Sequence, residues 1–308
     1  MLKRVLHIGF PQPGLERVFQ KADKYVFLKW QQFKAPYTDL HNQIVSICKD
    51  LQPELIFLHV QTPNVITQDC IKRIREICTP FICNWSGDVR YPLPQWYINL
   101  GKVINLTCFS NIEDVDSAVA AGIKAKFLNI GFDDKVYYPD ESRGVGWPQI
   151  VFMGNNYKTT FPLSVFRKEM VDRLSAEFGS RFKVYGNGWG NTMHLAENKE
   201  AECYRSCKIA INLSHFNYGR YSSDRLFRIM ASGAFCLSHN YKDINLDFIP
   251  GEDLDIWNDL DELVTKISHY LINDISVMAR NGCEKVFKEH TWENRIKELT
   301  CLIQPVLI

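Results

Sequence analysis

The chain has 308 residues, 46% hydrophobic and 23% charged, and its 36 basic and 35 acidic side chains nearly cancel. This length and composition are typical of a globular protein with two domains of about 150 residues each. The near-zero net charge excludes a bulk electrostatic attraction to nucleic acid or membranes, although it leaves a basic patch on one face possible.

The N-terminus, MLKRVLHIGF, is typical of a first strand and lacks the apolar core of a signal peptide. No apolar run approaches the roughly 18 residues needed to span a bilayer. The ten cysteines are scattered, and no second Cys or His pair lies at zinc spacing from Cys203 and Cys207. We therefore expect free thiols, no metal site and a cytoplasmic location.

Strands and helices alternate through the first half of the chain. The continuous apolar run ELIFLHV (54–60) is typical of a parallel strand that is covered on both faces. The other elements expected here are strands at 5–8, 25–28, 80–85, 104–109 and 124–130, helices near 40–51 and 71–78, and a helix capped by Ser110 that ends at Gly122.

A segment rich in Gly, Pro and charge (131–149) is the best linker candidate, and a second alternating series follows it. The expected strands are 150–155, 181–186, 207–214 and a run after Gly233. The expected helices are 164–178, 198–206, one beginning near Arg225, 260–271, 276–288 and 292–303.

This organisation predicts an α/β protein with two doubly wound, Rossmann-like domains that face each other across a cleft. The predicted domains are 1–140 and 141–290, and residues 291–308 form a C-terminal helix that can pack back on the first domain. Ligands of such sheets bind beyond the carboxyl ends of the strands. The candidate loops are therefore 9–14, 59–64, 84–91, 154–161, 186–191 and 214–224.

In the first half, Asp88 follows Gly87 on a tight turn after a strand. A carboxylate there is either a general base or hydroxyl-binding group, or a capping residue in a surface turn. His59 ends an apolar strand, where a buried, hydrogen-bonded histidine is expected more often than a catalytic one. Gln61 points the same way and can only donate and accept hydrogen bonds. Together with Gly9, His59 and Gln61 form the candidate acceptor side.

In the second half, MGNNYK (153–158) and YGNGWG (185–190) each place glycine directly after a strand. Glycine lets backbone N–H groups approach a phosphate, but neither stretch is a Walker loop or a G-x-G-x-x-G fingerprint. Each alone is equally an ordinary turn between a strand and a helix. Because the two stretches occur in successive strand–helix units of the same domain, they favour a ligand that both loops share.

The stretch GRYSSDRLFRIMASG (219–233) places three arginines, Arg220, Arg225 and Arg228, around the start of one short helix. A helix N-terminus combined with guanidinium groups suits a diphosphate. The alternative is a structural network in which Asp224 and other acids pair with these arginines.

Three stretches, SDRLFRIMASGAFCLSH, GEDLDIWNDLDELVTKISHYL and HTWENR, resemble the C-terminal domain of GT-B glycosyltransferases. The nearest type is the CgeB-like (spore maturation protein) group, with a donor domain similar to those of families 1 and 4. The resemblance covers residues 105–300 and also includes VFMGNNY, FKVYGNGW and NIGFDDKVYYPD. It implies that a nucleotide-sugar binds the C-terminal domain and an acceptor binds the N-terminal domain.

The resemblance also implies roles for individual residues. It places Gly154 and Asn155 near the phosphates, Tyr185, Gly186 and Trp189 near the base, Asn212 and Ser214 along the same cleft, and Arg225, helped by Arg220, at the diphosphate. The sequence departs from the family-4 pattern because Arg228 and Arg220 stand where two glutamates are usual. Asp224 is then a candidate to bind ribose hydroxyls.

We therefore expect a hexosyltransferase-like enzyme that moves a sugar from a nucleotide-diphosphate donor, a UDP-sugar first of all, to a hydroxyl acceptor. Arg225 and Asp88 are the candidate catalytic residues. The resemblance implies that arginine and a helix N-terminus, rather than a bound metal, stabilise the leaving diphosphate, so neither a metal nor another cofactor is expected. The acceptor stays open between a small molecule, a glycan, a protein and a modified DNA base. The alternatives are glycosylation of a hydroxymethylated base in DNA and a nucleotide-sugar binding protein without turnover.

Overall fold

The structure is a computed structural model and describes residues 2–140, 144–190 and 192–307. It divides into two compact units, which we call the N-terminal unit (Met1–Ile130 with Trp292–Ile308) and the C-terminal unit (Gly131–Thr291). The sequence-based boundaries lie at 140 and 290. Of the expected linker 131–149, residues 141–143 lie outside the described part of the chain, as does residue 191 of the expected loop 186–191.

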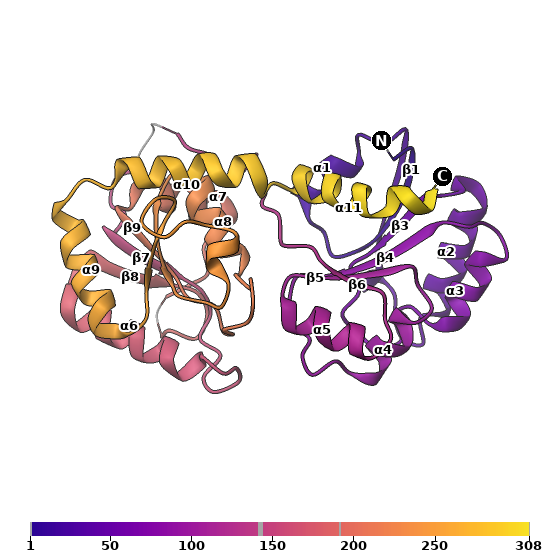
Figure 1. Cartoon of the computed structure of the whole chain (residues 1–308), viewed down its shortest axis with the longest axis horizontal. Coiled ribbons are helices and arrows are strands. Elements are labelled where there is room, and N and C mark those ends of the chain that lie inside the picture. The colour runs from indigo at the N-terminus through magenta and orange to yellow at the C-terminus, as the bar shows by residue number, and fades with distance from the viewer. Residues whose placement is uncertain (1, 141–143, 191, 308) are drawn as a thin grey trace. The chain divides into compact units, whose positions relative to one another are not determined.

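The N-terminal unit is a six-stranded parallel sheet with the strand order β2-β1-β3-β4-β5-β6 (Figure 1). Its elements in chain order are β1 (Arg4–Gly9), α1 (Pro13–Phe19), β2 (Lys24–Lys29), the 3-10 helix η1 (Trp30–Gln32), α2 (Thr38–Leu51), β3 (Leu55–Leu58), α3 (Gln68–Arg75), β4 (Phe81–Ser86), α4 (Gln95–Gly101), β5 (Leu106–Phe109), α5 (Ile112–Ala120), β6 (Ala125–Phe127) and α11 (Trp292–Leu307).

Helices cover both faces of this sheet. On one face, α2 and α3 pack their apolar stripes on β1 and β3 through side chains such as Leu40, Ile44 and Ile71. On the other face, α1 and α11 pack on the same strands through Phe19 and Leu299. The central strands are therefore buried on both sides, which is why β3 is a continuous apolar run and every residue of β4 is buried.

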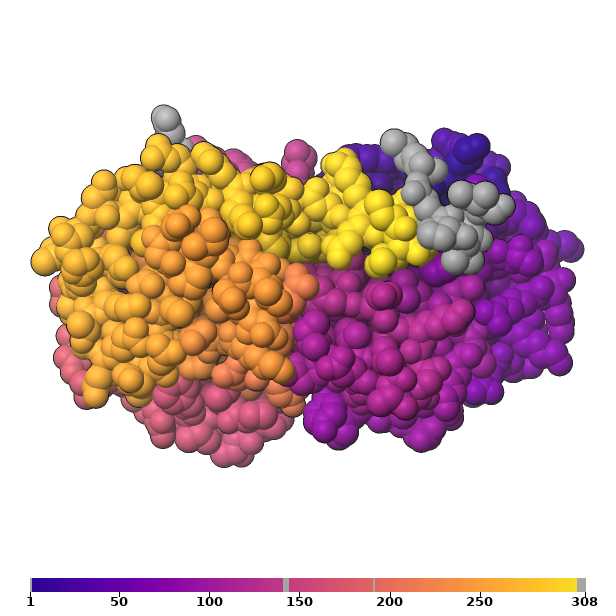
Figure 2. Space-filling view, in the orientation of Figure 1, coloured from indigo at the N-terminus to yellow at the C-terminus, as the bar shows by residue number. Residues whose placement is uncertain are grey.

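The last helix, α11, belongs to the N-terminal unit although it follows the whole C-terminal unit in sequence. It lies beside α1 (Figure 1) and buries four apolar side chains against the sheet: Trp292, Ile296, Leu299 and Ile303. Full burial of a large apolar side chain contributes about 1.5–3 kcal/mol, so this helix is part of the core of the unit. Its outer side, including Lys297 and Glu298, is exposed and forms part of the surface drawn in yellow in Figure 2.

The C-terminal unit is a five-stranded parallel sheet with the strand order β11-β10-β9-β7-β8. Its elements in chain order are β7 (Ile150–Met153), α6 (Ser164–Phe178), the 3-10 helix η2 (Gly179–Arg181), β8 (Phe182–Tyr185), α7 (Glu197–Ser206), β9 (Ile209–Asn212), α8 (Asp224–Ala231), β10 (Phe235–His239), the 3-10 helix η3 (Ile244–Leu246), β11 (Asp255–Trp257), α9 (Leu260–Ile272) and α10 (Ser276–Glu289).

One face of this sheet packs on α6 and α9, whose buried residues include Met170, Leu174 and Leu263. Helix α8 packs on β9, β10 and the helices α7 and α10. The two parallel sheets with helices on their faces confirm the predicted α/β class.

Some local expectations were wrong. The short helices α1 and α4 and the strand β11 were not expected, because none is long enough to show a clear period. The cap of α5 is Asn111 rather than Ser110: the Asn111 side chain accepts a 2.8 Å hydrogen bond from the Asp114 backbone N–H. The Ser110 hydroxyl instead donates to the carbonyl of Gly87.

All ten cysteines carry free thiols. Within the described part of the chain, none of the helices combines the length and the apolar character that crossing a membrane requires.

Candidate functional site

Each sheet reverses its winding direction at one point. In the N-terminal unit, β2 lies on one side of β1 and β3 on the other, and in the C-terminal unit β8 and β9 flank β7 in the same way. Ligands of parallel α/β sheets bind beyond the carboxyl ends of the strands at such a switch point. The residues that follow β7 and β9, and those that follow β1 and β3, are therefore the first candidates.

In the C-terminal unit, Arg225 folds back from the first turn of α8 onto the ends of β7 and β9. Its Nε donates to the carbonyl of Met153, and its Nη1 donates to the carbonyl of Leu213 at 3.0 Å and to Asn212 Oδ1 at 3.3 Å. The guanidinium also lies 5.0 Å from the centre of the Phe152 ring. Four contacts thus fix this charge at the switch point.

A second guanidinium lies beside it and is absent from the residues predicted from the sequence. Arg167, in the first turn of α6, is only 1% exposed and lies 4.7 Å from the centre of the same Phe152 ring. Its Nη1 contacts His215 Nε2, whereas its Nε and Nη2 are buried without a hydrogen-bond partner. Buried polar groups are nearly always paired, so these two unpaired donors make Arg167 a candidate ligand-binding residue.

The two guanidinium groups converge on Gly154, the first residue after β7. A Cβ atom at this position would overlap Arg167 Nη2 and would lie 2.9 Å from Arg225 Nη2. Glycine is thus required here because the two arginines fill the space that a side chain would need.

No carboxylate pairs with Arg167 or Arg225 in the described residues 2–140, 144–190 and 192–307. Burial and the neighbouring charge of Arg225 hold the pKa of Arg167 well below its usual range. A buried charge beside a second like charge, with no acidic partner for either, is costly, and a multiply charged anion near both would remove that cost.

The other two arginines of the 219–233 stretch are paired with acids. Arg220 makes a bidentate contact with the buried carboxylate of Asp247, with distances of 2.6 and 3.1 Å. Arg228 lies 2.8 Å from Asp224, 3.4 Å from the buried Glu200 and 3.8 Å from Glu197, and stacks on the ring of Tyr137. The structural network considered as the alternative therefore holds for Arg220 and Arg228, whereas Arg225 has no carboxylate partner among the described residues.

The loops after β7 and β8 are tied to each other. Asn155 Oδ1 accepts a 2.9 Å hydrogen bond from the backbone N–H of Asn187, and Trp189 Nε1 donates to the carbonyl of Gly154 at 2.6 Å. Gly154 N–H donates to the carbonyl of Tyr185 at 2.8 Å. Gly186 has a φ of +140°, and a Cβ there would overlap the Gly154 carbonyl. These contacts bring the glycine-containing loops together.

Asn212 and Ser214 are buried and bind protein groups. Asn212 Nδ2 donates to Ser238 Oγ at 3.0 Å, while its Oδ1 accepts from Arg225. Ser214 Oγ accepts from the backbone N–H of Ser223, the residue before α8, at 3.2 Å. Both side chains thus hold Arg225 and the start of its helix in place.

In the N-terminal unit, His59 and Gln61 form a bonded pair after β3. Gln61 Nε2 lies 3.1 Å from His59 Nε2, and the rings of His59 and Phe10 meet edge to face. Burial, with a smaller contribution from Arg90, lowers the pKa of His59 to about 4. A Cβ at Gly9 would lie 2.8 Å from the Cβ of His59, so glycine is needed for this close approach of β1 and β3.

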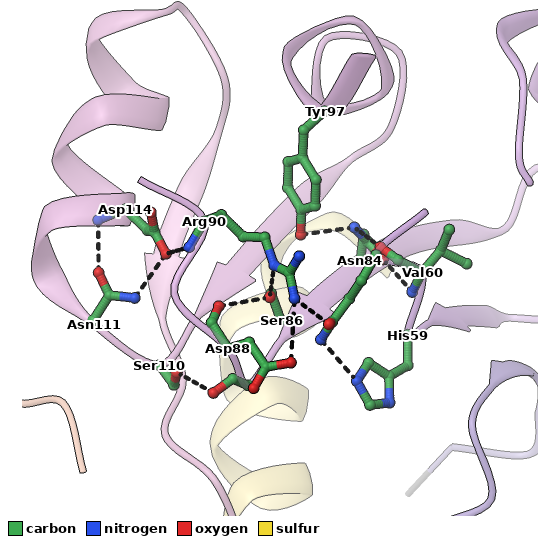
Figure 3. A network of polar contacts seen from close by, with 12 residues as sticks. His59, Val60, Asn84, Ser86, Asp88, Arg90, Tyr97, Ser110, Asn111 and Asp114 are labelled. Carbon is green, nitrogen blue, oxygen red and sulfur yellow. Dashed lines mark hydrogen bonds and ion pairs between the residues drawn. The ribbon is translucent and has the colours of Figure 1, made fainter. Parts of the chain in front are cut away.

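Arg90 organises the polar groups at the end of β4 (Figure 3). Its Nε donates to Ser86 Oγ at 3.1 Å, and its Nη2 contacts Gln61 Oε1 and lies 3.2 Å from Asp88 Oδ2. The Asp88 side chain is 68% exposed. The site therefore presents an accessible carboxylate held by a guanidinium, and Arg90 was not among the residues predicted from the sequence.

The backbone at Arg90 is fixed by a second acid. Its N–H donates to Asp114 Oδ2 at 2.6 Å, and Asn111 Nδ2 donates to the same oxygen at 2.7 Å. Burial raises the pKa of Asp114, and these hydrogen bonds oppose that shift. Figure 3 shows Asp114 and Asn111 on the side of Arg90 opposite His59. The 86–90 turn is thus anchored at both ends, which fixes where Asp88 stands.

Within the part of the chain that the structure describes, no group of three or more His, Cys, Asp or Glu side chains is arranged to hold a metal ion.

Comparisons with known proteins agree with this architecture. Residues 167–300, less than half of the chain, match the sequence profile of a family described as glycosyl transferase-like. No curated protein sequence matches the chain.

Among solved structures, the HepE protein of Anabaena in complex with UDP-glucose shares 12% identity with this chain at a TM-score of 0.64 and covers 99% of it and 100% of its own length. A glycosyltransferase from Rickettsia africae (10%, TM-score 0.67) and the sucrose-phosphate synthase of Thermosynechococcus elongatus (9%, TM-score 0.64) each cover 99% of both chains. At these identities the likeness shows the fold: two parallel-sheet α/β domains, as in GT-B glycosyltransferases.

Proposed function

We propose that this protein transfers a sugar from a nucleoside-diphosphate donor, a UDP-sugar first of all, to a hydroxyl acceptor, as a hexosyltransferase. The observation that carries the proposal is the pair of guanidinium groups of the buried Arg167 and the partly buried Arg225, which have no carboxylate partner among the described residues. The similarity of residues 167–300 to glycosyl transferase-like proteins supports the same assignment. The narrower resemblance to the CgeB-like group stays a prediction.

The two arginines suit the charge that this reaction develops. Transfer breaks the bond between the sugar's anomeric carbon and the diphosphate, which leaves with the bonding electron pair and an added negative charge. Guanidinium groups that are already held in place stabilise such a charge without reorganising. We therefore propose a reaction in which Arg225 and Arg167, rather than a resident metal ion, neutralise the diphosphate.

The rest of the donor is assigned to the loops tied to Gly154. We propose that Gly154 and Asn155 approach the phosphates and that Tyr185, Gly186 and Trp189 contact the base. Asp224 is proposed to bind ribose hydroxyls, because its side chain is 46% exposed although it also pairs with Arg228. In this assignment Arg220 and Arg228 are structural, since both are bound to acids.

The acceptor is assigned to the N-terminal unit. We propose that Asp88 accepts the proton of the acceptor hydroxyl as its oxygen forms the new bond to the anomeric carbon. Arg90 holds this carboxylate, while Gln61 and His59 are proposed to contact the acceptor beside it. A carboxylate already balanced by a guanidinium suits a neutral hydroxyl better than an anionic acceptor.

A panel of nucleotide-sugars and nucleoside diphosphates, read first by thermal shift and then by turnover, tests the proposal. We expect UDP and one or more UDP-sugars to raise the melting temperature, and slow donor hydrolysis that is lost in Arg225→Ala. If no nucleoside diphosphate shifts the melting temperature, the proposal is wrong. Binding of UDP without turnover in either protein would instead indicate a nucleotide-sugar binding protein.

A further inference from the structure

The hydrogen-bond partner of Arg167 is an imidazole, although buried arginines usually pair with carboxylates. Arg167 Nη1 contacts Nε2 of His215, three residues beyond the end of β9. Because a guanidinium can only donate, Nε2 of this histidine must be the acceptor, which puts the ring proton on Nδ1. His215 thus binds Arg167 as a neutral hydrogen-bond acceptor.

His215 is itself held firmly. Its Nδ1 lies 3.3 Å from Ser164 Oγ, and that hydroxyl oxygen accepts a 3.1 Å hydrogen bond from the backbone N–H of Phe161. The rings of Tyr157 and Phe161 lie 5.1 and 5.0 Å from the imidazole, centre to centre. A continuous chain therefore runs from the start of α6 through His215 to the Arg167 guanidinium.

The surroundings keep this histidine neutral. Burial lowers the pKa of His215 to about 3, and the nearby charges of Arg167 and Arg225 act in the same direction. Protonation would remove the acceptor and bring a third positive charge to the two guanidinium groups. At neutral pH the imidazole therefore stays an acceptor.

The same unit contains two arginines with the opposite kind of partner. Arg220 and Arg228 are bound to the carboxylates of Asp247 and Glu200, which offset their charges. Arg167 is more deeply buried than either, at 1% exposure, yet it is bound to a group that carries no charge. Arg220 and Arg228 thus form ion pairs within the fold, whereas the partner of Arg167 does not neutralise its charge.

We propose that His215 is a positioning residue that fixes Arg167 toward Gly154 without offsetting its charge, so that the full charge remains available to an anionic ligand. That this ligand is the diphosphate of a sugar donor rests on the proposed function. A carboxylate at position 215 would hold Arg167 equally well but would compete with the ligand. A small apolar side chain would leave Arg167 charged but free to move.

The test is a series of three substitutions, His215→Gln, His215→Ala and His215→Glu, titrated by calorimetry with inorganic pyrophosphate and with UDP. Glutamine keeps a neutral acceptor, so we expect affinities within about threefold of the wild type. Alanine removes the acceptor and should weaken both ligands about tenfold. Glutamate adds a competing charge and should weaken both on the order of 100-fold.

The melting temperature of the ligand-free variants provides the second readout. His215→Glu should melt at a higher temperature than His215→Ala, because its carboxylate pairs with the buried guanidinium. Stability and affinity then rank these two variants in opposite order, which a merely structural role would not produce. His269→Glu, which adds the same charge on the exposed side of α9, is the matched control and should change neither affinity.

Two outcomes would overturn the positioning role: His215→Glu binding pyrophosphate as tightly as His215→Gln, or affinities that simply follow the melting temperatures. If the wild type does not bind pyrophosphate, the anion site itself is wrong. If pyrophosphate binds in the expected order but UDP and UDP-sugars bind no more tightly than pyrophosphate, the proposed function fails and the role of His215 stands.

Discussion

The two units place an arginine at the carboxyl edge of their sheets, but they balance its charge differently. In the N-terminal unit, Arg90 lies 3.2 Å from the carboxylate of Asp88, which is itself accessible to solvent. In the C-terminal unit, Arg167 is buried, has two free donors and lies beside Arg225, and no carboxylate pairs with either in the described part of the chain.

This difference in charge balance suits the two units, which have the same architecture, to two different kinds of ligand. A guanidinium paired with an accessible carboxylate offers a hydrogen-bond acceptor and a base, which suit a neutral hydroxyl group. Two guanidinium groups without acids offer only donors and positive charge, which suit a diphosphate. Because a fold does not by itself determine a function, this local charge balance is stronger evidence than the shape of the sheets.

The largest expected effect is a loss of activity on replacing Asp88, the proposed general base. Asp88→Asn should lower the rate of sugar transfer about 100- to 10,000-fold, because it removes the group proposed to accept the proton. The affinity for UDP, measured by calorimetry, should stay within about threefold of the wild type. A variant that transfers sugar at the normal rate would remove Asp88 from the catalytic residues, and a large loss of UDP affinity would break the division of roles between the units.

In contrast to Asp88→Asn, Arg167→Met should lose affinity for UDP. Loss of the charge-assisted contacts is expected to weaken UDP on the order of 100-fold. The melting temperature of the free protein should not fall, because the variant also removes a buried charge without an acidic partner. Arg173→Met on the same helix removes an exposed arginine that pairs with Glu177, and should leave UDP affinity unchanged. Equal losses of UDP affinity in Arg167→Met and Arg173→Met would contradict the assignment of Arg167 to the anion site.

Arg220→Met tests whether a paired arginine of the same stretch is structural. It would leave Asp247, a side chain only 6% exposed, without its partner, at a cost of about 3 kcal/mol in the free energy of unfolding. UDP affinity of the folded variant should change by less than about threefold. Denaturant unfolding and calorimetry measure the two quantities. A loss of UDP affinity comparable to that of Arg167→Met would show that Arg220 belongs to the anion site.

The smallest expected effect is on acid stability. Burial, with a smaller effect of His59, lowers the pKa of His7 to about 3, against about 6.5 in an unfolded chain. The unfolded chain therefore binds a proton below pH 6.5 that the folded chain does not, so stability falls as the pH falls. We expect His7 to cost about 2 kcal/mol at pH 5 relative to pH 7. Urea unfolding of the wild type and His7→Leu should show this difference, and parallel pH profiles would contradict it.

Much of the fold could be predicted from the sequence because long periodic segments and buried parallel strands have clear patterns. Arg225 could be selected as a candidate because it stands at the start of the short helix α8 in a stretch with three arginines. Arg167 could not, because it lies within the apolar stripe of α6, three residues before Met170, where it was read as part of an ordinary amphipathic helix. A charged residue at such a position is the signal that could have identified it.

The pairing of the arginines with acids could not be predicted from the sequence for a different reason. Asp247 is 27 residues from Arg220, and Glu200 is 28 residues from Arg228. Arg228 also pairs locally with Asp224, four residues before it, but its contact with Glu200 and that of Arg220 with Asp247 are made across the folded unit, and no local spacing reveals them. The Arg90 network likewise joins the ends of β3 and β4 with the first turn of α5, which only the folded sheet brings together.

The most direct test of the uncompensated arginine pair compares uridine, UMP and UDP as ligands of the wild type and of Arg167→Met by calorimetry. For the wild type we predict that affinity rises with each phosphate and that UDP binds at least about 100-fold more tightly than uridine. In Arg167→Met most of that gain should disappear while uridine binds as before. Equal affinities for uridine and UDP, or a gain that survives the substitution, would contradict the assignment of this site to a diphosphate.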